Sequence, residues 1–86
     1  MGAIKRLHPI FVMRYRLDFS TGKSYYRTGM NQAISFAKFQ LRKLYCYDHL
    51  SMPRVDIFVL TDRPFLLTSI ENRNGVLCDL AYGYRL

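Results

Sequence analysis

The chain has 86 residues, of which 50% are hydrophobic and 15% aromatic, and this apolar content excludes an intrinsically disordered protein. Thirteen Lys and Arg residues against six Asp and Glu residues give a formal charge of +7, which favours polyanionic partners such as nucleic acid, an acidic protein surface or a membrane. The length suffices for one modest hydrophobic core, so we expect a single domain over residues 1–86.

Cysteine usage and hydropathy indicate a protein that stays in solution inside the cell. Cys46 and Cys78 are too few for a disulfide framework and lack CxxC spacing, so we expect reduced thiols, although a single bridge between them stays open. The sequence has no signal peptide pattern and no apolar run near the roughly 18 residues of a membrane-spanning helix. We therefore predict a cytoplasmic protein without a membrane partner.

The first part of the chain predicts a basic arm and a hairpin. Residues 1–9 form the arm, and Pro9 marks the start of a strand. From Ile10 to Phe19 apolar and polar residues alternate, which is typical of a long half-buried strand. A turn over residues 20–22 leads to a second, shorter strand, Lys23 to Thr28, and the two strands most simply pair as a hairpin.

The stretch Gly29 to Tyr47 has the clearest periodicity in the chain and predicts a helix. Its apolar residues recur at spacings of three and four: Met30, Ala33, Ile34, Ala37, Leu41, Leu44 and Tyr45. The two alanines would let the helix approach a sheet closely, and Thr28 is the expected N-cap. Phe39 points away from this stripe and Phe36 lies on its flank, so the outer side of the helix either makes a second contact or carries ordinary surface aromatics.

Three more strands are predicted after the helix. Val55 to Thr61 is largely apolar without alternation, which indicates a central strand covered on both faces. Phe65 to Glu71 follows, and Asn74-Gly75 predicts a type I′ turn into a last strand, Val76 to Tyr82. The order ββαβββ predicts an α+β domain with one helix packed on one face of a mixed, mostly antiparallel sheet.

No group of residues in the sequence predicts catalysis. The six carboxylates lie on different elements without the paired spacing of two-carboxylate or Mg²⁺ chemistry. The stretch STGKS at residues 20–24 lacks the upstream glycine and the following helix of a phosphate-binding P-loop. Cys46 and His49 are explained better as a structural cysteine and a solvated histidine than as a thiolate pair. We expect a protein that is not an enzyme and needs no cofactor or metal.

Two binding hypotheses remain. In the first, a small regulator or inhibitor, of the kind that phages direct against host machinery, docks on an acidic protein surface such as that of a nucleic-acid-handling machine. Its contact residues would be Phe36, Phe39, Arg42 and Lys43. Leftover apolar surface would also suit a homodimer.

In the second hypothesis, a sheet face that carries arginine and tyrosine binds nucleic acid directly. Here Arg14 and Arg16 share the face opposite the helix with Tyr25 and Arg27, and two helix residues assist, so the contact residues would be Arg14, Arg16, Tyr25, Arg27, Lys38 and Arg42. A solvated face with ordinary charges explains this set about as well. No RNA-recognition, zinc-finger or helix-turn-helix signature supports the direct binding of nucleic acid.

Overall fold

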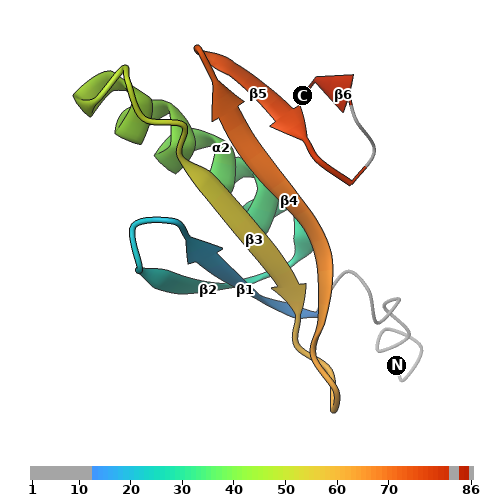
Figure 1. The fold of residues 1–86 in the computed structure, drawn as a ribbon. Coiled ribbons are helices and arrows are strands. Elements are labelled where there is room, and N and C mark those ends of the chain that lie inside the picture. The colour runs from blue at the N-terminus through green and yellow to red at the C-terminus, as the bar shows by residue number, and fades with distance from the viewer. Residues whose placement is uncertain (1–12, 82–83, 86) are drawn as a thin grey trace.

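In the computed structural model, which describes residues 13–81 and 84–85, one helix lies across one face of a twisted sheet (Figure 1). The elements are β1 (Arg14–Phe19), β2 (Ser24–Thr28), α2 (Met30–Tyr47), β3 (Arg54–Val59), β4 (Phe65–Arg73), β5 (Val76–Asp79) and β6 (Tyr84–Arg85). The predicted α+β class and the order ββαβββ are confirmed, and the two-residue strand β6 is added. The basic arm at residues 1–9, the strand residues 10–12 and Tyr82 lie outside the described residues.

Every pair of neighbouring strands described in the sheet is antiparallel, in the order β2-β1-β3-β4-β5-β6. The sequence predicts a mixed sheet because a helix that links two adjacent strands makes them parallel. Here β2 and β3 do run in the same direction, but β1 lies between them and is antiparallel to both. The connection through α2 therefore passes over β1, and no parallel pair forms in the described sheet.

The hydrophobic core lies between α2 and the sheet. The buried helix residues Ala33, Ala37 and Leu41 recur every four positions, which places them on one side of the helix. They form one cluster with residues of four strands: Tyr15, Leu17, Phe19, Val55, Ile57, Val59, Ile70 and Leu77. Burial raises the pKa of Tyr15, because the phenolate would lose its hydration there. The alternation predicted for β1 is confirmed.

No helix in the described part of the chain is long and apolar enough to cross a membrane.

Helix α2 begins one residue later than predicted, after Gly29 instead of Thr28. Gly29 is the N-cap with φ 90° and ψ 137°, and no side chain caps the first turn. Thr28 is instead the last residue of β2 and pairs with Arg14. The chain passes from strand to helix within one residue, and glycine adopts the positive φ that this requires without steric cost. The Gly29 N–H donates to the carbonyl of Met13 at 2.9 Å, which ties this turn to β1.

The predicted Asn74-Gly75 turn is confirmed, with φ 53° and 90° at its two central residues. The buried amide of Asn72 holds this turn to the helix. Its Nδ2 donates to the carbonyl of Leu41 at 3.2 Å, and its Oδ1 accepts from the N–H of Gly75 at 2.8 Å. One buried side chain thus joins the β4–β5 hairpin and α2.

Strand β3 is central, but only its helix-facing side is fully covered. Val55, Ile57 and Val59 are buried, whereas Phe58 on the other face is half-buried. The prediction of a strand covered on both faces is therefore wrong for the open face. Arg16, the cross-strand partner of Phe58, places its guanidinium carbon 4.6 Å from the ring centroid. An arginine shields the ring there, an interaction worth about 0.5–1 kcal/mol at an exposed site.

Candidate binding surfaces

The open face of the sheet carries three arginines whose charge is cancelled by an acid on the same strand. Residues two apart on a strand point to the same face, and each of β1, β3 and β4 has an arginine and an acid at this spacing. The ion pairs are Arg16–Asp18 at 3.1 Å, Arg54–Asp56 at 3.1 Å, and Arg73–Glu71. The hydrogen bond that the Arg73 guanidinium donates to the Glu71 carboxylate raises the pKa of Arg73 above its ordinary value. This face is therefore less positive than its arginines suggest.

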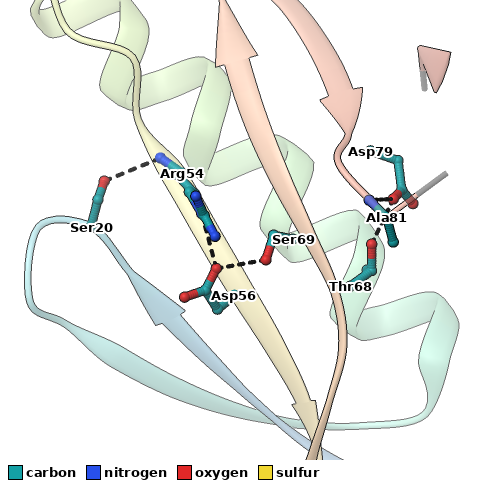
Figure 2. Close-up of polar contacts among 7 residues, drawn as sticks. All are labelled: Ser20, Arg54, Asp56, Thr68, Ser69, Asp79 and Ala81. Atoms are coloured by element: carbon teal, nitrogen blue, oxygen red, sulfur yellow. Dashed lines mark hydrogen bonds and ion pairs between the residues drawn. The ribbon is translucent and has the colours of Figure 1, made fainter. Parts of the chain in front are cut away.

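Serine hydroxyls hold two of these carboxylates in place. The Oγ of Ser69 donates to Asp56 Oδ1 at 2.7 Å, the same oxygen that accepts from Arg54 Nε (Figure 2). On the neighbouring strand, Ser24 Oγ donates to Asp18 Oδ1 at 2.8 Å. An arginine could turn toward a phosphate here only by leaving a carboxylate that is already fixed. The open face is built as a neutralised polar surface.

Asp79 is a buried acid with a structural role. The hydroxyl of Thr68 donates to its Oδ1 at 2.6 Å, and the N–H of Ala81 donates to the same oxygen at 2.9 Å (Figure 2). The carboxylate thus fixes the end of β5 against β4. Among the described residues, no three His, Cys, Asp or Glu side chains gather as metal ligands do.

The structure separates the residues of the nucleic-acid hypothesis onto two faces. Tyr25 and Arg27 pair with the buried residues Leu17 and Tyr15, so both lie on the helix side of the sheet. The expectation that they share a face with Arg14 and Arg16 is wrong. The tyrosine on the open face is Tyr26, which is 50% exposed and pairs with Arg16.

Phe36 belongs to the packed flank of the helix, and its assignment to an outward docking surface is wrong. Its ring centroid lies 4.9 Å from that of Tyr25 and 6.2 Å from that of Phe19. Arg27 covers the ring, with its guanidinium carbon 3.9 Å from the centroid. Phe36 therefore joins α2 to β2.

Arg27 also blocks the outer edge of β2, the strand at one side of the sheet. In an antiparallel pair, every second residue bonds to the neighbouring strand through its backbone and the residues between them point their backbone groups outward. The hydrogen bonds from Phe19 N–H to Lys23 and from Gly29 N–H to Met13 show that Tyr26 is one of the outward-pointing residues of β2. Arg27 Nη1 donates to the carbonyl of Tyr26 at 2.7 Å. A cation over an outward carbonyl discourages the addition of another strand there.

We expect the Arg27→Ala variant to lose about 1 kcal/mol of stability, because it loses the contact with Phe36. We also expect it to self-associate as concentration rises, because the edge of β2 becomes free to pair. Urea denaturation and sedimentation velocity measure the two effects. Arg63→Ala is the matched control, since Arg63 is exposed and has no ion pair with a described residue. Sedimentation identical to the native protein would contradict the role in blocking the edge.

The outer side of α2 keeps the features predicted from the sequence. Phe39 is 58% exposed, and Arg42 and Lys43 are exposed three and four residues further on, which makes them its neighbours on the helix surface. Neither of these two cations, nor Lys38 on the same helix, forms an ion pair within the described part of the chain. The helix sequence contains no Asp or Glu. Positive charge thus remains uncompensated on this side of the molecule.

Exposed apolar side chains continue past the end of α2, a feature that sequence reasoning missed. Tyr47 is 80% exposed, Leu50 95% and Met52 59%. The loop that carries them is ordered by Asp48, whose Oδ1 accepts from Leu50 N–H at 3.0 Å and whose carbonyl accepts from Ser51 Oγ at 3.0 Å. In the sequence this segment looks like an ordinary connection, because its composition has no periodicity.

Both cysteines are free, so the bridge left open by the sequence is not formed. Cys46 is exposed on α2, and Cys78 is half-buried in β5, where it pairs with Glu71. The ring of His49 lies against Tyr45, with a centroid distance of 4.8 Å. The structure gives no contact between Cys46 and His49.

Comparison with known proteins identifies no relative of this chain. A scan against protein-family models finds no match, and searches of curated proteins and of solved structures find none either. The assignment of function therefore depends on the residues of this chain alone.

Proposed function

We propose that the protein is a non-enzymatic binding protein, a regulator or inhibitor, that docks the outer side of α2 on an acidic protein surface. The observation that carries the proposal is the unequal distribution of charge. Arg16, Arg54 and Arg73 on the open sheet face are paired with acids, whereas α2 has three cations, no acid and no ion pair in the described structure. Phe39 stands among these cations.

The chemistry of this surface, defined by Phe39, Arg42 and Lys43, fits a partner with an apolar pocket bordered by carboxylates. Burial of the phenylalanine supplies affinity at about 25 cal/mol per Å² of apolar area. The two cations accelerate association with an acidic partner and disfavour basic ones. A second copy of this chain fits less well, because a two-fold contact would bring the same cations together.

Direct binding of nucleic acid is the less favoured function. Arg16 is paired with Asp18, and Tyr25 and Arg27 face the helix side. Of the residues assigned to it, Arg14 remains on the open face without an ion pair, and Lys38 and Arg42 lie on α2. A nucleic acid would have to contact these across two different sides of the molecule.

We expect Phe39→Asp to leave the fold intact and to weaken binding of the partner at least about tenfold, because it removes an apolar anchor and adds a charge that repels carboxylates. A pull-down from the native cell with mass spectrometry identifies the partner, and calorimetric titration of the purified partner measures the affinity. Phe65→Asp is the matched control: Phe65 is 52% exposed, at the start of β4. It should bind as the native protein does.

Three outcomes would contradict this proposal. Unchanged affinity of Phe39→Asp for the partner would show that the helix surface does not bind it. Equal losses of affinity in Phe39→Asp and Phe65→Asp would show that the effect is not specific to the helix surface. Oligonucleotide binding in fluorescence anisotropy at about 50 mM salt, weakened by Arg14→Ala/Arg16→Ala and by added salt, would favour the nucleic-acid function instead. Sizing of native protein and Phe39→Asp checks for a dimer formed through the same surface.

A further inference from the structure

A hollow of about 330 Å³ lies between the β1–β2 turn and the C-terminal half of α2. Lys23 and Tyr25 line it from the side of the sheet, and Gln40, Lys43 and Tyr47 line it from the helix. Lys23 and Lys43 are twenty positions apart in the sequence and come together only in the fold. Lys43 also belongs to the surface around Phe39, so the hollow continues that surface.

The polar groups of this hollow are suited to an anion. The ammonium groups of Lys23 and Lys43, the phenols of Tyr25 and Tyr47 and the amide of Gln40 can all donate hydrogen bonds. No acid lines the hollow, and neither lysine forms an ion pair within the described structure. Two cations lining one small space repel each other unless a negative charge lies between them.

A second hollow, of about 340 Å³, adjoins the first and differs from it in charge. The two share Thr21, Leu44 and Tyr47, but the second is lined by Met52, Pro53 and the acid Asp48. An acidic side chain is repelled there, whereas an apolar one meets methionine and proline. The two adjoining hollows therefore differ in chemistry: the first suits an acidic side chain, and the second suits an apolar one.

We propose that the first hollow receives an Asp or Glu side chain of the partner and that the second receives an apolar side chain beside it. This inference rests on the proposed function and names the partner's chemistry: an acidic residue next to an apolar one on an exposed segment. Lys23 and Lys43 hold the carboxylate from two sides, and the tyrosine rings cover the methylene groups of the acidic side chain. Lys43 links this contact to Phe39.

The test uses the full ¹⁵N-labelled chain and two short peptides, one with Glu beside Leu and one with Gln in place of Glu. We expect saturable amide shifts at Lys23, Tyr25, Lys43 and Tyr47 with the Glu peptide and binding about tenfold weaker with the Gln peptide, because a charge-assisted contact is lost. Lys23→Glu should weaken binding of the Glu peptide by a similar factor. Arg63→Glu, which changes the net charge equally at an exposed site elsewhere, should not.

The outcomes separate this inference from the proposed function. Equal binding of both peptides, shifts elsewhere or no shifts would overturn the carboxylate site, and the result for Phe39→Asp with the partner would still stand. Saturable binding of inorganic phosphate at these residues without binding of the Glu peptide would also overturn it, in favour of a phosphate ligand. Lys23→Glu must keep the native amide spectrum, as expected for an exposed turn side chain.

Discussion

Leu41→Ala should lower the free energy of unfolding by about 3 kcal/mol, because the truncation leaves a cavity that the surroundings only partly fill. The other buried residues of α2 are Ala33 and Ala37, so Leu41 is the one large side chain of the helix that is fully buried. Small domains have about 5–15 kcal/mol of stability in total, and the loss is a large part of it. Urea denaturation followed by circular dichroism measures the change.

Leu50→Ala is the matched control for this prediction, since the same atoms are removed from a side chain that is 95% exposed. Its stability should stay within about 0.5 kcal/mol of the native protein. In thermal unfolding, each kcal/mol lost should lower the Tm by about 4–8 °C for a domain of this size. A loss below about 1 kcal/mol for Leu41→Ala would mean that α2 does not carry the core.

The correct predictions depend on features that neighbouring residues determine by themselves. The periodicity of α2, the alternation of β1 and the Asn74-Gly75 turn are each set within one segment. The faces of β2 were predicted wrongly because they depend on the register of the hairpin. Phe19 N–H bonds to the carbonyl of Lys23 and fixes that register, and a shift of one residue would move Tyr25 and Arg27 to the open face.

Residues distant in the sequence decide the other features that were missed. Whether Phe36 on the helix flank is covered depends on how far β2 extends beneath it, and Arg16 reaches Phe58 only because β1 and β3 are neighbours. The hollow likewise requires the turn at Lys23 to lie beside Lys43. No local pattern contains these contacts, because each joins elements that the topology brings together.

One missed feature was readable in the sequence. The segments Arg16-Leu-Asp18, Arg54-Val-Asp56 and Glu71-Asn-Arg73 each place opposite charges two residues apart, within a predicted strand or at one end of it. Period-two geometry puts both members on one face, where they pair. This signal predicts that the sheet face is neutralised and that the free positive charge lies on the helix.

The second large loss of stability is expected for Asn72→Leu, although leucine is similar in size to asparagine and more hydrophobic. Asn72→Leu removes the partners of the Leu41 carbonyl and of the Gly75 N–H, and loss of a hydrogen bond at a buried polar group costs about 1–3 kcal/mol. We expect a total loss of about 2 kcal/mol, since water reaches the exposed turn and compensates in part. Asn31→Leu, at an exposed position of α2, is the matched control and should change little.

Hydrogen exchange tests the Asn72 contact separately from overall stability. If Asn72 joins the β4–β5 hairpin to the helix, the variant should lose protection from exchange first at Gly75 and then along β5. Amides in the β1–β3 pairing should keep the protection that the lowered global free energy of unfolding allows. The reason is that the bridge from Asn72 to Leu41 fixes one end of the sheet, whereas β1 and β3 are held by the buried cluster under α2. A uniform loss of protection across all strands would instead show that the Asn72 side chain contributes only to the common core and that the hairpin does not open on its own.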